Sequence, residues 1–391
     1  MFWLWFVLVV GQCALLFILA RTGEALPRRA REEAAAAAAM PDAQWPAAAL
    51  IVPVAGADPR MEGALRSLLT QDYPGLAPVL VTATESEPAA ELVTRLCKDF
   101  PATRHVVAGP AQGCGQKNHN LLAGVDAVGP AAEVYLFCDS THQAAPDLAR
   151  QLAGPLVRGE AAFTTGYHEV DPGDSQTATL GYAFCVMLMR LLQAMGAFTQ
   201  LWGGAMGMSR AAFKKYGVRS LWSETVVDDC SLTALLQVRG AGVRLCPGAL
   251  LRTEAANHPP HVWRAWMDRQ VLFLKFCMPG QWLLLGLLAV MTAVPVLGAV
   301  LSLLGWLLHL GGGAGVLLTL FWLAATAGAL YLWRALLPRP VSLLRWLWAY
   351  GRSVCLFARV YAASVGATGI AWRGIRYVVG RGGVVRETSR Q

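Results

Sequence analysis

Charged residues are scarce in this sequence. They make up 15% of its 391 residues, whereas hydrophobic residues make up 55%, and the mean hydropathy is +0.43. A soluble domain of this length normally carries more charge, so we expect part of the surface to face lipid.

None of the nine cysteines belongs to a C-x-x-C motif. Most of them lie inside apolar runs, as Cys138, Cys185 and Cys277 do. This pattern favours buried free thiols in a reducing compartment over disulfides or a zinc site.

The sequence also lacks a helix-turn-helix, zinc-finger or RNA-binding signature. Its net charge is nonetheless +8, and it comes mostly from arginine. The basic residues cluster beside apolar segments, which indicates an anionic membrane surface or a phosphate-bearing ligand. We therefore expect no nucleic acid among the partners.

The first apolar run, residues 1–20, has no basic residue before it. A cleaved signal peptide normally has one, whereas here several arginines between Arg21 and Arg31 follow the run. As a helix the run is about 30 Å long, which matches a bilayer core. We predict a retained transmembrane anchor at 1–20 and a linker at 21–46, with the amino end outside and the following domain cytoplasmic.

Near the other end, Trp282–Leu310 and Gly315–Leu337 are two long apolar segments with no lysine or arginine between them. This pattern predicts two transmembrane helices that form a hairpin within residues 282–337. The segment before them, residues 263–281, is expected to lie at the membrane interface and to contribute to the active site.

Residues 338–391 are more basic. Arg345, Arg352 and Arg359 recur every seven residues and therefore share one helical face. We predict an interfacial helix whose arginines meet lipid phosphates, although a further crossing at 341–370 stays open. The tail at Arg376–Glu387 is expected to form a small basic hairpin on the cytoplasmic side.

Residues 47–262 alternate between strands and helices, which predicts an α/β fold with a doubly wound, mostly parallel sheet. The most apolar strand is Glu133–Cys138, whose composition indicates burial on both faces. The apolar segment Gly181–Leu201 is interrupted by Arg190. It is expected either at the membrane interface or as a buried core helix.

Several polar residues follow the predicted strands. Asp139 comes directly after the central strand, at the sheet edge where ligands bind in this fold class. It could hold a divalent cation, or it could begin a loop through an Asx turn. Glu85 and Glu87 follow the second strand, where a carboxylate could accept the N–H of a uracil base or simply favour a helix N-terminus.

Three further features carry possible chemistry. Lys117 opens a helix after the Gln112–Gly115 loop, which suits a phosphate or an ordinary solvated helix start. Of the pair Asp228 and Asp229, one would suffice as a helix cap, so the other could serve as a general base. The stretch Trp266–Gln270 either belongs to the same site or lies in the membrane interface.

The order of these features, followed by membrane helices, resembles the glycosyltransferases of the family 2 type, and more narrowly their ceramide glucosyltransferase-like branch. The resemblance covers nearly the whole chain. It is carried by Ala49–Gly75, Ala83–Ala89, Gly115–Leu121, Tyr135–Leu148, Trp202–Phe213, Val226–Leu232 and Ile370–Tyr377.

The resemblance implies the sheet of a glycosyltransferase A-type fold and a set of site residues. Asp229 is implied as the catalytic base, with Asp228 and Arg269 in the catalytic set. Asp139 is implied as the metal ligand, for Mg²⁺ or Mn²⁺ on the donor diphosphate. The implied donor-binding residues are Pro53, Glu85, Glu87, Lys117, Asp139, Trp266 and Gln270. The final motif of the family, (Q/R)-x-x-R-W, is replaced here by Trp266-x-x-Arg269-Gln270.

The expected function is that of an inverting hexosyltransferase. It would move a sugar from a nucleotide sugar, expected to be a UDP-sugar, to a hydroxyl of a membrane lipid such as ceramide or diacylglycerol. The alanine- and arginine-rich composition suggests a bacterial cytoplasmic membrane, with the catalytic domain in the cytosol. The alternatives are a polysaccharide-elongating membrane glycosyltransferase and a transporter or receptor with a degenerate nucleotide-sugar domain. The sequence leaves the sugar and the lipid open.

Overall fold

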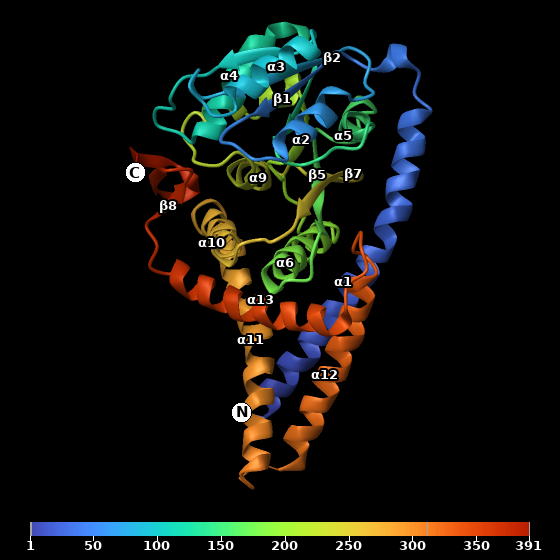
Figure 1. The fold of residues 1–391 in the computed structure, drawn as a ribbon, viewed down its shortest axis with the longest axis vertical. Helices are drawn as coiled ribbons and strands as arrows, with labels where there is room; N and C mark the ends of the chain where they lie inside the picture. Colours follow the sequence, from blue (N-terminus) through green and yellow to red (C-terminus); the bar gives the residue numbers. More distant parts are fainter. Residues whose placement is uncertain (1, 311, 391) are drawn as a thin grey trace.

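The computed structural model describes residues 2–310 and 312–390. An α/β domain lies at one end of the molecule, and a bundle of long helices extends from it (Figure 1). Further helices lie between these two parts, and a small second sheet lies at one side of the molecule. The N-terminus lies in the bundle, far from the α/β domain.

The central sheet has seven strands in the order β3-β2-β1-β4-β6-β5-β7 within the described residues. Neighbours pair in parallel except at β6, which is antiparallel to both β4 and β5. The predicted α/β class with a mostly parallel sheet is therefore confirmed. The strands are β1 (Ala48–Pro53), β2 (Leu76–Thr82), β3 (Arg104–Val107), β4 (Val134–Cys138), β5 (Phe163–Pro172), β6 (Ala205–Ser209) and β7 (Arg244–Ala255).

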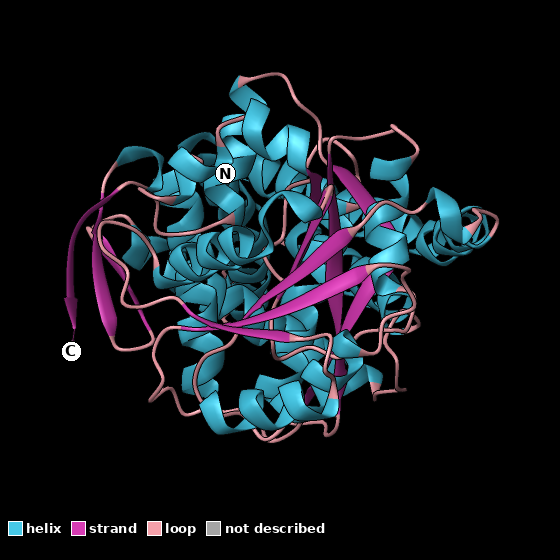
Figure 2. Cartoon of the chain, turned by 90° about the horizontal axis from the view of Figure 1, so that it is seen from above, coloured by secondary structure: helices cyan, strands magenta, loops and turns pink. Residues whose placement is uncertain are grey.

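Helices cover both faces of this sheet (Figure 2). In β1, Leu50 and Val52 pack into one apolar cluster, while Ala49 and Ile51 pack into another on the opposite face. Alternate residues of a strand point to opposite faces, so both faces of β1 are buried. The helices of this domain are α2 (Met61–Leu69), α3 (Ala90–Asp99), α4 (Gln116–Val128), α5 (Leu148–Val157), α7 (Arg210–Lys215), α8 (Val218–Trp222) and α9 (Asp229–Val238).

The first helix, α1 (Phe2–Ala38), is longer than the predicted anchor. Most of the segment 21–46, predicted as a linker, continues this helix and packs beside β7 and α5 (Figure 1). Arg28 and Glu32 form an i,i+4 ion pair of 2.9 Å, and Glu33 contacts Arg244 at 3.3 Å. The alanine-rich sequence favours helix, and docking on the domain holds it in place.

In the part of the chain that the structure describes, three helices are long and apolar enough to span a membrane: α1, α11 (Pro279–Leu307) and α12 (Gly313–Arg334). The latter two form a hairpin, as predicted for residues 282–337, and α1 packs against both. Gln12 is buried among them and accepts a hydrogen bond from Trp322 Nε1 at 2.7 Å. Its amide also donates to the hydroxyl of Tyr350, in the helix at Leu343–Ser364, so this side chain links α1 to α12 and to that later helix.

α13 (Leu343–Ser364) lies across the bundle where α11 and α12 meet the rest of the molecule (Figure 1). It is not among the three helices that could span a membrane. Its arginines at 345, 352 and 359 are all exposed. Between α13 and the sheet lie α6 (Thr177–Gln193) and α10 (Pro260–Cys277). α6 is largely buried, and Arg190 is neutralised by Glu169 at 3.4 Å, so the apolar segment after residue 180 forms a core helix.

A three-stranded antiparallel sheet ends the chain at the edge of the molecule (Figure 2). Its strands are β8 (Gly369–Trp372), β9 (Ile375–Val379) and β10 (Val385–Arg390). The hairpin expected at Arg376–Glu387 corresponds to β9 and β10, whereas β8 was not predicted. Short 3₁₀ segments lie at Asp42–Gln44, Gly129–Ala131 and Arg381–Gly383.

Candidate active site

A buried lysine joins acidic residues from two parts of the sheet edge. Lys117 lies in the first turn of α4, and its Nζ atom is 2.9 Å from Asp139 Oδ1 and 3.1 Å from Asp228 Oδ2. The same Nζ donates a hydrogen bond of 3.0 Å to the carbonyl of Gly203. Asp139 follows β4, and its side chain is 33% exposed, whereas that of Asp228 is 2% exposed.

Asp229 lies beside these groups and is half-buried. Its Oδ2 accepts a hydrogen bond of 2.8 Å from the backbone N–H of Gly203, and its Oδ1 accepts one of 2.6 Å from that of Cys230. Asp228 precedes α9 but makes no side-chain capping bond. The side chain of Asp228 is therefore directed to Lys117, whereas that of Asp229 binds one N–H of the helix start and one of Gly203. We call Lys117, Asp139, Asp228 and Asp229 the acid cluster.

The acid cluster contains three carboxylates and one ammonium group. Burial disfavours the charge on Lys117, but Asp139, Asp228 and Asp229 outweigh that effect and raise its pKa. Burial raises the pKa of Asp228 to about 6; Lys117 opposes the rise, and the neighbouring carboxylates add to it. With all four groups ionised the cluster carries excess negative charge, which favours a cation at this site.

The loops after β1 and β2 lie next to each other. The carboxylate of Glu87 accepts a hydrogen bond of 2.6 Å from the backbone N–H of Gly56, three residues beyond Pro53 at the end of β1. Glu85 is exposed, and in the described part of the chain its side chain makes no hydrogen bond. The two glutamates look equivalent in the sequence but differ in their contacts. Glu87 binds the loop after β1, whereas the carboxylate of Glu85 is exposed to solvent.

The motif residues Trp266, Arg269 and Gln270 lie on α10. Trp266 packs edge-on against Tyr182 of α6, with ring centroids 5.0 Å apart. Burial raises the pKa of Tyr182, Arg60 and Arg269 lower it, and Asp139 raises it. The contact with Trp266 places Tyr182 of α6 directly against α10. Gln270 is half-buried and makes no side-chain hydrogen bond among the described residues.

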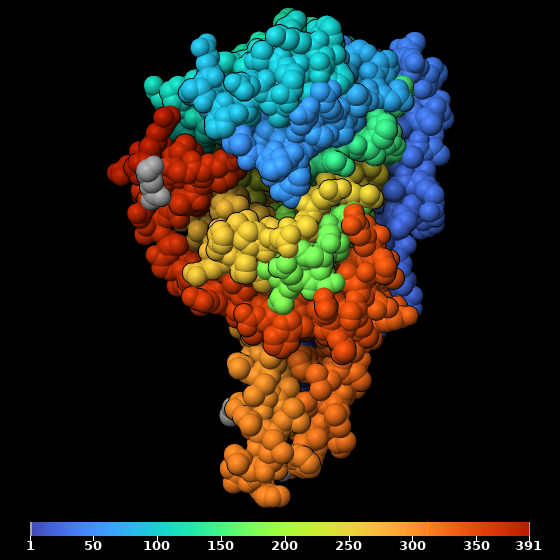
Figure 3. All heavy atoms as spheres, in the orientation of Figure 1, coloured from blue at the N-terminus to red at the C-terminus, as the bar shows by residue number. Residues whose placement is uncertain are grey.

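The molecular surface is hollowed between the first half of the α/β domain and α10 (Figure 3). In that view blue and cyan segments form one side of the hollow, yellow-orange α10 the other, and the red C-terminal segment lies along one end. The structure brings Lys117, Asp139 and Asp228 into contact, and Asp229 binds the N–H of Gly203, whose carbonyl accepts from Lys117. Arg269 belongs to the α10 side.

Sequence reasoning missed a buried aromatic group behind the acid cluster. His142 and His168 share the hydroxyl of Thr253, at 2.7 and 2.8 Å from their Nδ1 atoms. The ring of Trp202 stacks on His168 with centroids 4.7 Å apart. Burial lowers the pKa of both histidines, which favours their neutral forms. These contacts fix the segment that leads to Gly203.

Gly203 is required by close approach. A Cβ atom at this position would lie 2.5 Å from Asp228 Oδ2 and 2.7 Å from Lys117 Nζ. The glycine pair after Trp202 was the available sequence signal. Gly115 has a similar reason: its N–H donates to Thr225 at 2.9 Å, and a side chain there would collide with Val226. The glycine-containing loop before α4 therefore packs against the segment leading to the two aspartates.

Comparison with known proteins identifies the chain. The model of glycosyl transferase family 21 matches residues 3–385.

The chain belongs to glycosyl transferase family 21. This match supports the resemblance to the ceramide glucosyltransferase-like enzymes that the sequence indicated. It spans almost the whole chain. No curated protein sequence matches this family 21 chain significantly. A similar solved structure is the mannosyltransferase PcManGT from Pyrobaculum calidifontis in complex with GDP-Man and Mn²⁺, with 14% identity and a TM-score of 0.48. The similarity covers 92% of this chain and 96% of that one.

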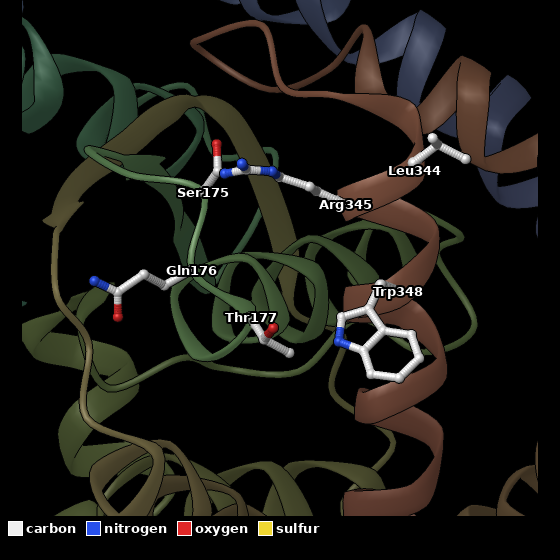
Figure 4. Close-up of a pocket in the computed structure, with 6 residues that line it drawn as sticks. All are labelled: Ser175, Gln176, Thr177, Leu344, Arg345 and Trp348. Carbon is white, nitrogen blue, oxygen red and sulfur yellow. The ribbon is translucent and has the colours of Figure 1, made fainter.

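A second depression of about 480 Å³ lies away from the acid cluster, between the start of α6 and α13 (Figure 4). Arg345 extends toward Ser175 in this view, and Trp348 lies on the next turn of α13. The depression combines a guanidinium, an indole and hydroxyl groups. Its lining residues are Ser175, Gln176, Thr177, Leu344, Arg345 and Trp348.

Proposed function

We propose that this family 21 glycosyltransferase moves a sugar from a UDP-sugar to a hydroxyl group of a membrane lipid, with inversion at the anomeric carbon. The observation that carries the proposal is the acid cluster, in which Lys117 at the start of α4 pairs with Asp139 after β4 and with Asp228 before α9. It offers a half-buried carboxylate, Asp229, next to the buried ion pair of Lys117 and Asp228. Apolar helices that could span a membrane begin directly beyond α10.

Asp229 is proposed as the general base. The two backbone N–H groups that bind its oxygens fix the orientation of the carboxylate. The acceptor hydroxyl would attack the anomeric carbon from the side opposite the leaving nucleoside diphosphate, while its proton passes to Asp229. One displacement forms the new C–O bond and breaks the old one. No covalent sugar–enzyme intermediate is needed, so the configuration inverts.

Arg269 and a divalent cation are proposed to bind the leaving group. Within residues 2–310 and 312–390, no group of three or more His, Cys, Asp or Glu side chains could hold a metal. The residues nonetheless fit Mg²⁺ or Mn²⁺, because Asp139 is partly open, the cluster has excess negative charge, and such ions commonly take further ligands from substrate phosphates. Asp139 would hold the ion, which when bound would offset charge on the diphosphate. Arg269 would add a fixed positive charge from α10.

Glu85 is the proposed contact to the uracil base, because Glu87 is already engaged by Gly56. Pro53 would shape the loop after β1 beside the base. Lys117 would act near the donor through Asp139, whose orientation it fixes. Trp266 and Gln270 would line the α10 side of the donor site.

A lipid acceptor is supported by the position of the site. α6, α10 and α13 lie between the sheet and the candidate spans, and α13 exposes three arginines on one side. Arginine and tryptophan are favoured at the level of lipid headgroups, which suits α13 to the interface and the depression in Figure 4 to a phosphate-bearing headgroup. We propose the cytosolic side of a bacterial cytoplasmic membrane, since arginines follow the first apolar run on the domain side.

The direct test is incubation of the purified full chain with labelled UDP-sugars or GDP-mannose and a membrane lipid extract. A single labelled glycolipid with inverted configuration is expected from one UDP-sugar. A long polymer would instead support polysaccharide elongation. Binding of a nucleotide sugar without transfer to any lipid would contradict the proposed catalysis.

Gly203→Ala should nearly abolish transfer. The added Cβ would force Asp228 and Lys117 apart, because it would lie 2.5 Å from Asp228 Oδ2. We expect a loss of about a hundredfold or more, as for a displacement of about 1 Å in a catalytic arrangement. Initial rates with saturating donor would measure it. Gly242→Ala is the control, since a Cβ there meets nothing within 4 Å; equal losses would contradict the packing argument.

The pH profile of transfer should have an acid limb near pH 6. Burial raises the pKa of Asp228 to about 6. As the pH falls through that value Asp228 becomes neutral, Lys117 loses a partner, and activity decreases. Asp228→Asn should remove this limb, although it lowers the rate at neutral pH. If the acid limb near pH 6 stays unchanged in Asp228→Asn, a group other than Asp228 causes it.

A further inference from the structure

The turn between β8 and β9 contains an arginine in an unusual backbone conformation. Trp372 pairs with Ile375, so Arg373 and Gly374 are the two central residues of the β8–β9 turn. Their φ angles are 49° and 73°. Positive φ at both positions defines a type I′ turn, which prefers Asn-Gly or Asp-Gly. An arginine at the first position is conformationally unfavourable, so its side chain is a candidate for a functional role.

Arg373 reaches the loop after β1. Its Nη1 atom lies 3.3 Å from the position that a Cβ atom on Gly56 would occupy. Gly56 is the residue whose N–H is bound by Glu87. The guanidinium therefore lies against the loop after β1, which Glu87 connects to the loop after β2.

The β8–β9 turn also lies beside the part of α10 that carries Arg269. Trp372, next to Arg373, packs edge-on against Phe273, one helical turn after Arg269, with ring centroids 6.4 Å apart. Burial lowers the pKa of Arg269, and the positive charge of Arg373 lowers it further. Among the residues that the structure describes, neither arginine forms a salt bridge, whereas nearby Arg60 pairs with Asp58 at 2.7 Å. Two neighbouring guanidinium groups repel each other unless an anion lies between them. Arg269 lies on α10 and Arg373 in the β8–β9 turn, so the folded chain brings together two residues that are far apart in the sequence.

The C-terminal sheet is fixed to the segments that carry the acid cluster. The hydroxyl of Tyr377 accepts a hydrogen bond of 3.3 Å from the N–H of Gln116, next to Lys117. The N–H of Val226 donates to Gly383 at 2.9 Å, just before the two aspartates. Because the sheet is held at these points, the position of Arg373 relative to the acid cluster is defined.

We propose that Arg373 binds the diphosphate of the donor together with Arg269, so that the C-terminal sheet completes the donor site. The inference rests on the proposed function. A planar guanidinium binds two phosphate oxygens at once, and two such groups from different elements would match the two phosphates of a nucleoside diphosphate. Arg373 is thus a substrate-binding residue outside the Trp266–Gln270 motif.

The test is binding of UDP, UMP and uridine to the full chain in detergent, measured by calorimetry with Mg²⁺ present. Arg373→Asn suits the type I′ turn while removing the charge. We expect UDP to bind about tenfold more weakly or worse, UMP to lose less, and uridine to change little, because a charge-assisted hydrogen bond is lost at the phosphates. The unfolding temperature should stay equal or rise. Arg373→Lys should recover part of the UDP affinity.

Arg376→Asn is the matched control. Arg376 is exposed on β9, next to buried Tyr377 and therefore on the opposite face of the strand. The Arg376→Asn variant should bind UDP with the affinity of the unaltered chain. Unchanged UDP affinity in Arg373→Asn, or equal losses in both Arg373 variants with a lower unfolding temperature, would overturn the assignment. If the unaltered chain bound neither UDP nor another nucleoside diphosphate, the proposed function itself would fail.

Discussion

Replacing Asp229 by asparagine is expected to lower the rate of sugar transfer by about a thousandfold, within the range for loss of a general base. The substitution keeps the shape of the side chain and an oxygen that can still accept the N–H of Gly203. It removes the ability to take a proton from the acceptor hydroxyl. Binding of UDP should change little, because the proposed contacts to the diphosphate come from Asp139, Arg269 and Arg373. Single-turnover transfer and UDP calorimetry on the same preparation measure the two effects.

Asp126→Asn is the control for this substitution. Asp126 is an exposed aspartate that pairs with Arg219 on the surface, so its removal should leave transfer unchanged. A rate within tenfold of the unaltered chain in Asp229→Asn would contradict the base assignment. If Asp228→Asn lost more activity than Asp229→Asn, the buried aspartate would become the better candidate.

Much of the sheet, and the presence of several polar residues at its edge, could be predicted because burial leaves a clear pattern. β1 and β4 are almost continuous apolar runs, which a strand covered on both faces requires. Asp139 stands out because a carboxylate directly after such a run contributes little to packing. Asp228 and Asp229 stand out because one helix start does not need two carboxylates.

Other features depend on contacts that no local pattern carries. Glu85 and Glu87 look equivalent in sequence, and only the fold places Gly56 against Glu87. The extension of α1 beyond residue 20 has no clear apolar periodicity, but docking on β7 and α5 stabilises it. The β8–β9 turn escaped prediction because it contains Arg373-Gly374 in place of the usual Asn-Gly.

Lys117→Met should destabilise the fold as well as abolish transfer. Lys117 is the one cation in contact with both Asp139 and Asp228 in the described acid cluster. Removing one partner of a buried ion pair typically costs about 3 kcal/mol, because the remaining charge is left uncompensated. We expect a clearly lower unfolding temperature in detergent at neutral pH. Lys98→Met, at an exposed position on α3, should have no such effect.

The loss in Lys117→Met should depend on pH in a definite direction. Burial already raises the pKa of Asp228 to about 6, and loss of the ammonium group should raise it further. The folded state then keeps a proton that the unfolded chain releases above about pH 4, so stability falls as the pH rises. The variant should therefore be closer to the unaltered chain at pH 5 than at pH 8. Lys117→Met combined with Asp228→Asn should recover much of the stability at pH 8, since no ionisable group stays buried at position 228. A loss that is equal at both pH values, and that the second substitution does not relieve, would mean that packing rather than charge makes Lys117 necessary.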